Sequence, residues 1–397
     1  MNRDRPIARV LQVHTRYRQA GGEEEVVAAE KELLEAAGMD VRQVIFDNSD
    51  LRESESFISD MRLAASAIWS KTAYRRVSAA LLAHGSQVMH VHNTFAAASP
   101  SVYDAGVDRG VPVVQTLHNY RLVCPVATLF RDGRPCTDCV GRGLPWPGVV
   151  HACVRGSRSL SLVAAATLGI SRARGTLARR IALYLALTQF QRDQMIAGGL
   201  PVNRIRVLPN FLIRDPGASS GERRGVVFAG RLAAEKGVEV LLDAASLVPG
   251  VVSVIGDGPL APAAQAANAA GAIRYQGRLS RPDVIDKIRR SIALVIPSVW
   301  FEGFPLVLLE AYASAIPVIA SGIGSLGELV EHGTTGLVAE PGDPPALAAR
   351  IQWAVDHPER MREMGRTARH RFETRFRAET HLTALLDSYE FARAWQR

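Results

Sequence analysis

Residues 8–46 read ARVLQVHTRYRQAGGEEEVVAAEKELLEAAGMDVRQVIF, and this stretch decides the fold class. Two short apolar runs rich in β-branched residues, Ala8–Val13 and Val41–Phe46, have the length and composition of strands. Between them, Glu23–Ala37 carries valine and leucine at helical spacing and is followed by Gly38, a common helix terminator. A strand, a helix and a second strand in this order predict a parallel βαβ unit.

The same alternation continues along the chain. Further strand-like runs in the first half are Gln87–Val91, Val113–Leu117, Tyr184–Thr188 and Ile205–Leu208. Those in the second half are Val226–Ala229, Val251–Ile255, Ile273–Tyr275, Leu294–Ile296 and Val318–Ala320. A long helical tail is expected from Pro345 onward, and Asp215–Gly221 is a turn-rich linker near the middle. The pattern predicts an α/β protein of two doubly wound domains with a hinge near residues 215–222.

Length and composition suit this fold. The 397 residues fit two domains of roughly 100–200 residues each. The hydrophobic share of 47% and the charged share of 22% exclude disordered, fibrous and disulfide-scaffold classes. No run of about 18 uncharged apolar residues occurs, so no membrane-spanning helix is expected. The first residues lead into a strand-like run without a signal-peptide core, which predicts a cytoplasmic protein.

The net charge of +8 is concentrated in the N-terminal half. Residues 1–215 hold 27 basic and 19 acidic residues, and residues 109–214 hold 15 arginines against three aspartates. This asymmetry predicts an anionic partner: phosphates, an acidic glycan or the inner membrane surface, where the protein would bind peripherally. A general preference for arginine is the alternative, since only four of the 47 cations are lysine. Nucleic acid is not an expected partner, because no aromatic residues interleave with the arginines.

Ligands of parallel sheets bind beyond the carboxyl ends of the strands, so the loop after each strand is where chemistry is expected. The pair Gly21-Gly22 follows the first strand and would let backbone N–H groups approach a phosphate. It is not a G-x-G-x-x-G pattern, which argues against a dehydrogenase. After the strand Val226–Ala229, Arg231 and Lys236 are two cations that can converge on a diphosphate. The turn Gly256–Pro259 could line a nucleotide pocket or be only a turn.

The strongest signal is Trp300–Ala311, which reads WFEGFPLVLLEA. Glu302 precedes a helix for which Pro305 is a suitable first residue, and Glu310 lies within that helix on an apolar face. A buried carboxylate needs hydrogen-bond donors, and sugar hydroxyls are such donors. The unsatisfied N–H groups at the helix start would face an anion. That start comprises Phe304, Pro305, Leu306 and Val307.

These motifs resemble the retaining, nucleotide-sugar-dependent glycosyltransferases of family 4, which have the GT-B fold, and the resemblance covers essentially the whole chain. It is most specific in G-R-L-x-x-E-K-G (230–237) and E-G-F-P-L-V-L-L-E-A (302–311). It implies two Rossmann-like domains, residues 1–214 and 222–375, that face a central cleft. The C-terminal helix of residues 376–397 would pack back on the first domain.

The resemblance also implies roles for individual residues. Arg231 and Lys236 would bind the donor diphosphate, and Glu310 would bind the ribose. Glu302 would hold hydroxyls of the donor sugar together with backbone of residues 304–307. His118, which follows the strand Val113–Leu117, corresponds to the family histidine beside the transferred sugar. The remaining donor-binding candidates are Gly21, Gly22, Asn210, Gly230, Asp257 and Gly258. The family commonly has P-N-G-V-D where this chain has P-N-F-L-I at 209–213.

All four cysteines, Cys124, Cys136, Cys139 and Cys153, fall in an insertion at about 119–158. The C-x-x-C pair at 136–139 has zinc-knuckle spacing, and the other two thiolates would complete a tetrahedral site, with His151 as a substitute ligand. Free thiols and a redox disulfide are the other interpretations. A zinc ion held in this way would be structural and would have no open position for catalysis.

The expected activity is transfer of a hexose from a UDP- or GDP-sugar to a glycan, lipid-linked or polyol acceptor, with retention through front-face attack. No Asp-x-Asp occurs in the sequence, so no cofactor is expected for catalysis. Arg231, Lys236 and helix N-termini would instead stabilise the leaving diphosphate. The alternatives are a nucleotide-sugar epimerase, a phosphorylase on the same fold, or a catalytically silent subunit of a glycosyltransferase complex.

Overall fold

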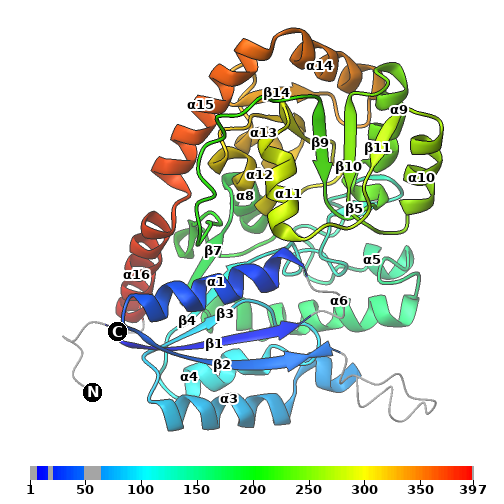
Figure 1. The fold of residues 1–397 in the computed structure, drawn as a ribbon. Coiled ribbons are helices and arrows are strands. Elements are labelled where there is room, and N and C mark those ends of the chain that lie inside the picture. The colour runs from blue at the N-terminus through cyan, green and yellow to red at the C-terminus, as the bar shows by residue number, and fades with distance from the viewer. Residues whose placement is uncertain (1–6, 17–20, 49–63, 396–397) are drawn as a thin grey trace. The chain divides into compact units, whose positions relative to one another are not determined.

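The computed structural model describes residues 7–16, 21–48 and 64–395 and divides the chain into two compact units. The first unit runs up to Leu129, continues over Thr137–Pro209 and resumes from His381 onward. The second unit comprises Phe130–Cys136 and Asn210–Thr380. Each unit is an open, parallel six-stranded sheet covered by helices (Figure 1). The predicted α/β class with two Rossmann-like domains is confirmed.

The first sheet has the strand order β2-β1-β3-β4-β7-β8. Its strands are β1 (Arg9–Arg16), β2 (Asp40–Asp47), β3 (Val88–Val91), β4 (Val113–Leu117), β7 (Leu183–Ala186) and β8 (Ile205–Val207). The helices are α1 (Gly22–Ala36), α3 (Lys71–His84), α4 (Ser101–Asp108), α5 (Pro147–Val150), α6 (Arg158–Ala173), α7 (Thr176–Arg179), α8 (Gln189–Ala197), η2 (Val202–Arg204) and α16 (Ala378–Trp395). A short antiparallel ladder joins β5 (Phe130–Arg131) to β6 (Arg134–Pro135).

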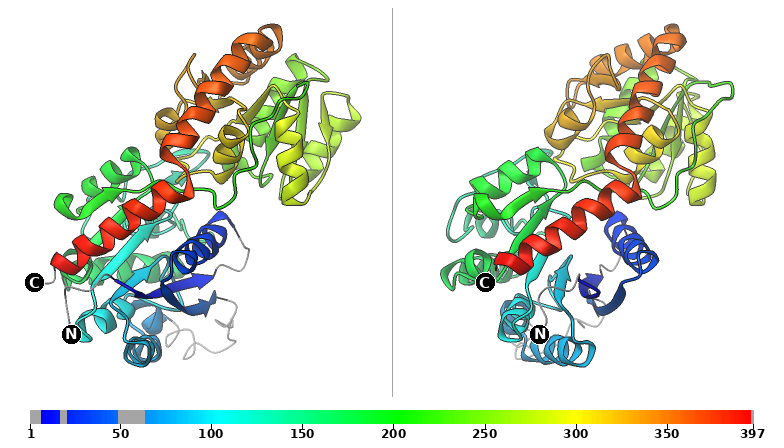
Figure 2. Two further views of the ribbon diagram at one scale, coloured as in Figure 1. Left: turned by 60° about the vertical axis from the view of Figure 1, so that its left-hand side comes forward. Right: turned by 90° about the vertical axis from the view of Figure 1, so that its left-hand side faces the viewer.

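The last helix, α16, belongs to the first unit. Its residues Leu385, Tyr389 and Ala392 are fully buried in the core that also contains Leu34 of α1 and the valines of the first sheet. Figure 2 shows α16 running alongside this sheet. The C-terminal helix therefore completes a hydrophobic face that the N-terminal strands begin.

The second sheet has the order β11-β10-β9-β12-β13-β14. Its strands are β9 (Val226–Ala229), β10 (Val252–Ile255), β11 (Ile273–Tyr275), β12 (Ala293–Ile296), β13 (Val318–Ser321) and β14 (Gly336–Ala339). The helices are η3 (Ala234–Lys236), α9 (Val238–Leu247), α10 (Ala261–Ala269), α11 (Arg281–Arg289), α12 (Leu306–Ala313), α13 (Gly324–Leu329), α14 (Pro344–Asp356) and α15 (Pro358–Arg375). Within the described ranges, no helix combines the length and the apolarity needed to cross a bilayer.

The structure differs from the expected pattern in three places. The predicted tail from Pro345 is not one helix but three, because α14 stops before Pro358 and α15 stops at Arg375. Strand β14 was not predicted. The expected hinge segment is tied to the second unit: Asp215 pairs with Arg369 at 2.6 Å, and Ser219 N donates to Ser314 O at 2.9 Å. The units divide at Pro209/Asn210 and Thr380/His381 instead.

The packing of α16 can be tested by mutation. Leu385→Ala removes a side chain that is 0% exposed, and the resulting loss of burial and packing should cost about 2–5 kcal/mol of unfolding free energy. Leu82→Ala on α3, at a side chain 61% exposed, is the matched control and should change it by less than about 0.5 kcal/mol. Urea denaturation followed by circular dichroism measures both. Equal midpoints for the two variants would show that α16 does not stabilise the first unit.

Candidate functional site

In the second sheet, the strand order reverses between β9 and β12. Ligand sites of open parallel sheets form at the carboxyl ends of the strands at such a reversal. The loop after β9 carries Arg231 and Lys236, and the loop after β12 carries Glu302. The structure thus brings the two most specific sequence motifs to one edge of one sheet.

Lys236 and Glu302 form a direct ion pair. Lys236 Nζ lies 2.8 Å from Oε1 and 3.0 Å from Oε2 of Glu302, and Ser298 Oγ donates to Oε1 at 2.6 Å. Glu302 is only 4% exposed. Burial alone would raise the pKa of its carboxyl, but the Lys236 ammonium, its hydrogen bonds and that of Ser298 outweigh burial and lower this pKa. Glu302 is therefore a buried, ionised carboxylate with a cation beside it.

Gly237 allows this pair to form. Its φ is 68°, in the left-handed region, and a Cβ at this position would lie 1.8 Å from the carbonyl oxygen of Pro297. Any other residue would keep the loop after β9 away from the loop after β12. Val299 N also donates to Glu235 O at 3.1 Å, so backbone hydrogen bonding holds the two loops together.

The turn after β10 supports the same loop. At Gly256, a Cβ would lie 1.8 Å from Gly230 O, and Leu232 N donates to Asp257 O at 2.9 Å. The Asp257 carboxylate accepts from Gly258 N at 2.7 Å, which fixes the turn. In the structure these predicted donor-binding residues shape the loop that carries Arg231.

The other predicted residues of this edge also have partners within the unit. Glu310, 6% exposed on α12, accepts from Arg281 Nε at 2.8 Å, and Arg281 was not predicted. Arg231 forms an ion pair with Glu235. Asn210 Nδ2 donates to Phe304 O at 3.2 Å, so Asn210 holds the chain just before α12. The structure makes Pro305 the N-cap of α12, one residue before the position expected from the sequence.

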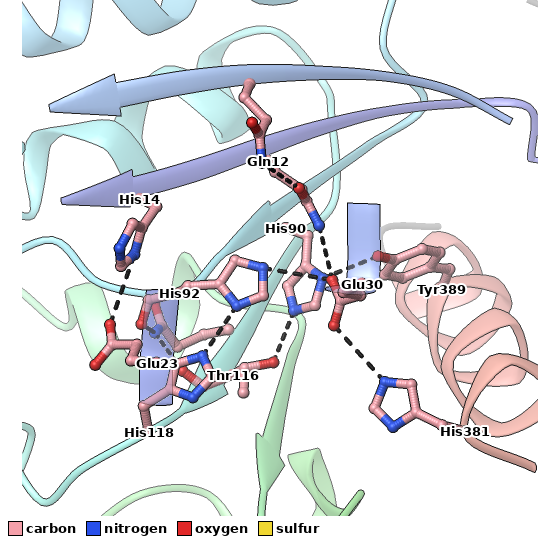
Figure 3. Close-up of polar contacts among 12 residues, drawn as sticks. Gln12, His14, Glu23, Glu30, His90, His92, Thr116, His118, His381 and Tyr389 are labelled. Atoms are coloured by element: carbon pink, nitrogen blue, oxygen red, sulfur yellow. Dashed lines mark hydrogen bonds and ion pairs between the residues drawn. The ribbon is translucent and has the colours of Figure 1, made fainter. Parts of the chain in front are cut away.

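In the first sheet the order reverses between β1 and β3, and three histidines lie at the carboxyl ends of its central strands. His14 is near the end of β1, His92 follows β3 and His118 follows β4. His92 Nδ1 and His118 Nε2 are 3.0 Å apart. The His14 ring meets that of His92 edge-on, with 6.4 Å between centroids (Figure 3). The predicted His118 is thus one member of a histidine cluster.

A buried carboxylate, Glu30 of α1, lies behind these histidines (Figure 3). Its Oε1 accepts from Gln12 Nε2 at 2.9 Å and lies 2.8 Å from His90 Nδ1 and 3.4 Å from His92 Nε2. On α16, His381 Nε2 is 3.7 Å from Glu30 Oε2. Glu30 is 1% exposed, so these side chains replace water around its charge.

Burial and neighbouring groups shift the pKa values of the Glu30 carboxyl and of three histidines in the cluster. Burial lowers the pKa of His118 well below its usual value, and His92 and His14 lower it further. Burial also lowers the pKa of His92, with His90 acting in the same direction, and lowers that of His14 to about 3. Burial alone would raise the pKa of Glu30, but His90 and His92 hold it well below the usual range. Glu30 is therefore an ionised carboxylate, and the His14, His92 and His118 rings of the cluster are neutral.

The glycine pair begins α1 as predicted, but acidic residues occupy this helix start. Gly21 N donates to Glu24 Oε2 at 2.8 Å, which is the half of a capping box that a glycine permits, and Glu24 N donates to the backbone Gly21 O at 3.2 Å. Glu23 is half-buried, and loss of solvation together with Glu24 raises its pKa well above the usual value. In the structure Gly21 and Gly22 serve as a helix cap, and their contact with a donor phosphate stays a prediction.

The four cysteines differ in burial. Cys124 and Cys139 are buried and Cys136 and Cys153 are half-buried. In the part of the chain that the structure describes, three or more potential ligand atoms lie within one metal's reach only at Glu30, His90 and His92. A structural zinc at the four thiols stays a prediction.

Glu30 and its partners were not predicted from the sequence, although signals for some of them were present. Glu30 follows Val26 by four residues and precedes Leu33 and Leu34, so helical spacing places it on the buried face of α1. The H-V-H run at 90–92 ends a predicted strand, where functional residues were expected. No local pattern indicates that His381 and Tyr389 of α16 reach this cluster.

Two family models match the chain in succession. Residues 21–210 match the glycosyl transferase 4-like domain, and residues 211–371 match glycosyl transferases group 1. Glycogen synthase from Mycobacterium tuberculosis is 33% identical over 196 residues, which are 47% of this chain and 46% of that protein. The D-rhamnosyltransferase WbpZ from Pseudomonas aeruginosa is 35% identical over 160 residues, 39% of this chain and 42% of that protein. The chain thus spans less than half the length of these curated relatives.

Solved structures match nearly the whole chain. Sucrose-phosphate synthase from Thermosynechococcus elongatus superposes with a TM-score of 0.69 at 18% identity, covering 96% of this chain and 98% of that chain. Anabaena Alr3699/HepE in complex with UDP gives a TM-score of 0.64 at 18% identity, covering 95% and 98%. These likenesses concern the fold, while the family models rest on sequence. Together with the paired loops of the second sheet, they show that the chain belongs to the group 1, family 4-like glycosyltransferases of the GT-B fold.

Proposed function

We propose that this glycosyltransferase moves a hexose from a nucleoside-diphosphate sugar to a saccharide, lipid-linked or polyol acceptor with retention of configuration. The observation that carries this proposal is the Lys236–Glu302 pair at the strand-order reversal of the second sheet. A cation suits a leaving diphosphate, and a buried carboxylate beside it suits the hydroxyls of the attached sugar. The Alr3699/HepE structures that resemble this chain were solved with UDP and with UDP-glucose, which supports a nucleotide-sugar donor.

In the proposed reaction, Lys236 and Arg231 stabilise the charge that develops on the departing diphosphate. Both already have acidic partners, Glu302 and Glu235, so donor binding would exchange an internal ion pair for a phosphate contact. Glu302 would orient the sugar, and Glu310, held by Arg281, would accept hydrogen bonds from the ribose.

Transfer would proceed by front-face attack. The acceptor hydroxyl attacks the anomeric carbon on the side from which the diphosphate leaves, the bond from that carbon to the phosphate oxygen breaks, and the hydroxyl proton passes to the departing phosphate. His118, half-buried at the end of β4, would contact the transferred sugar. Because no Asp-x-Asp clamp occurs in the sequence, we propose that this transfer needs no divalent metal.

We further propose that the first unit binds an anionic membrane surface through α6. Leu162 and Ile170, eight residues apart on one face of this helix, are 54% and 39% exposed. Exposed Trp146 lies just before α5, which packs on α6, and Arg158 is exposed at the start of α6. Apolar side chains flanked by arginine suit the boundary between headgroups and acyl chains.

Some of the arginines within residues 109–214 have structural roles within the protein. Arg172 donates to Leu122 O at 3.0 Å and to Arg142 O, so it holds the insertion in place. Arg180 lies 3.3 Å from Asp104. The membrane proposal therefore rests on the exposed face of α6 and not on the total number of arginines.

A panel of nucleotide sugars tests the proposed activity. In EDTA, one UDP- or GDP-sugar should release its nucleoside diphosphate, and transfer to an acceptor should continue. A conversion of the sugar without diphosphate release would indicate an epimerase, phosphate-dependent release of sugar phosphate would indicate a phosphorylase, and no turnover would indicate a silent subunit. Activity that is lost in EDTA and restored by magnesium or manganese would contradict the metal-independent mechanism.

Substitution of Glu310 and of Glu302 should have different effects on the kinetics. Glu310→Gln weakens contacts to a part of the donor that does not react, so donor KM should rise with a smaller effect on kcat. Glu302→Gln disturbs the sugar at the reacting carbon, where a displacement of about 1 Å costs on the order of a hundredfold in rate, so kcat should fall strongly.

Steady-state kinetics and calorimetric titration of the free nucleoside diphosphate distinguish the two variants. Glu359→Gln, at a surface carboxylate of the same unit, is the control and should behave as the unmodified protein. If Glu302→Gln abolishes nucleotide binding while Glu310→Gln preserves it, the two roles are reversed.

Membrane binding is tested by sedimentation with phosphatidylcholine vesicles, with and without phosphatidylglycerol. Binding should require the anionic lipid and weaken with salt, since each well-placed cation contributes about 1 kcal/mol. Leu162→Glu and Ile170→Glu should each reduce it, whereas Leu82→Glu on α3 should not. The proposal would be refuted if binding did not change with ionic strength, or if neither α6 substitution reduced it.

A further inference from the structure

The proposed reaction does not use the network around Glu30. A fully buried carboxylate is unfavourable unless donors surround it, and four polar side chains from three elements lie around this one. Gln12 comes from β1, His90 and His92 come from or follow β3, and His381 comes from α16 (Figure 3). So many polar side chains on one buried carboxylate suggest more than a packing role.

A bound metal does not account for this arrangement. The Glu30 Oε1 and His90 Nδ1 atoms are 2.8 Å apart, which is a hydrogen-bond distance, and Gln12 donates to the same oxygen at 2.9 Å. His90 Nε2 is also engaged, 2.8 Å from Thr116 Oγ1, and Tyr389 OH lies 2.9 Å from His90 Nδ1. Of the three residues that a metal would need, Glu30 and His90 already use these atoms for hydrogen bonds, so we interpret the cluster as a hydrogen-bonded network.

One branch of the network leads to His118. His92 Nε2 lies 3.4 Å from the Glu30 carboxylate, which can only accept hydrogen bonds, so the negative charge of Glu30 favours the His92 tautomer in which Nε2 carries the proton. In a neutral imidazole the other nitrogen is then an acceptor, so His92 Nδ1 accepts from His118 Nε2 at 3.0 Å. The His118 proton is consequently on Nε2, and its Nδ1 has a lone pair.

We propose that Glu30 and His92 are positioning residues that hold His118 in the Nε2–H tautomer, so that its Nδ1 accepts a hydrogen bond from a hydroxyl of the transferred sugar. This inference rests on the proposed function, because it assigns that hydroxyl to the sugar next to His118. If the network were absent, His118 would exchange between two tautomers, one of which would present a donor to the sugar.

The surrounding groups favour this arrangement over one with a charged His92. Burial and the neighbouring His90 keep the pKa of His92 below its usual value, so the ring stays neutral. Tyr389 and Thr116 hold the His90 ring at both nitrogens, which fixes the second imidazole on Glu30. Glu23, the other carboxyl near the cluster, lies 3.6 Å from His14 Nδ1.

The tautomer is measured directly by nitrogen-15 NMR of the protein with labelled histidine, and the His118 signals are assigned by their loss in His118→Asn. We expect a protonated Nε2 and an unprotonated Nδ1 for His118. In Glu30→Gln and in His92→Gln this preference should be lost. His84→Gln is the matched control, because His84 is also a buried histidine beside a carboxylate, 3.1 Å from Asp40, in the same unit. It should leave the His118 signals unchanged.

Kinetics supply the second readout. Glu30→Gln and His92→Gln should lower kcat, on the order of a hundredfold if the sugar loses its alignment, while donor KM changes little. His84→Gln should have the kcat of the unmodified protein. Thermal unfolding checks that each variant is folded, and His92→Gln decides the outcome if removal of the Glu30 charge prevents folding.

The two readouts separate this inference from the proposed function. A protonated Nδ1 in the unmodified protein overturns the inference, whether or not the protein transfers a sugar. An unchanged kcat in a folded His92→Gln variant also overturns it. If the tautomer is as expected and responds to Glu30 and His92 but no nucleotide sugar is turned over, the network is supported and the proposed function fails.

Discussion

A carboxylate removed from water must meet donors within hydrogen-bond distance, and this requirement governs both halves of the protein. In the second unit, Glu302 lies below the protein surface only because Lys236 and Ser298 reach it. The ammonium can do so because the backbone at Gly237 approaches Pro297 more closely than any side chain would permit. In the first unit, Glu30 is buried because two strands, the residue after one of them and the last helix direct polar side chains toward it. Much of the positioning of loops at the two strand-order reversals follows from satisfying these charges.

The same requirement explains why the candidate residues are held in place by other side chains before a nucleotide sugar would bind. Arg281 holds Glu310, Glu235 holds Arg231, and Asn210 holds the chain before α12. Side chains fixed in this way lose little further freedom when a ligand binds, which favours accurate placement. An incoming diphosphate would have to compete with Glu302 and Glu235 for the two cations, so affinity and selectivity depend on charges already within the protein.

The fold and the edge of the second sheet could be predicted because their signals are local. Apolar runs such as Val226–Ala229 and the glycines, cations and glutamates that follow them are read within a window of a few residues. Strand β14 was missed because it is short and begins with Gly336, which is placed there by its close approach to Val318 O and not by strand propensity. The partners of Glu302 and Glu30 are separated from them in sequence by 66 and up to 351 residues, as Lys236 and His381 show, and no periodicity encodes such contacts. The sequence therefore allowed the types of residue at the site to be predicted, but not which charged residues pair with one another.

The position of α16 has a consequence for how the protein is made. His90 and Tyr389 touch although 299 residues separate them, and α16 also brings His381 to Glu30. During translation, the strands of the first sheet leave the ribosome long before α16 does, so the nascent first unit has a buried carboxylate with an incomplete set of partners. That unit reaches its final state only after the second unit has been synthesised. A chain that stops early would therefore present an unfinished first unit to chaperones and proteases, and only full-length copies would escape them.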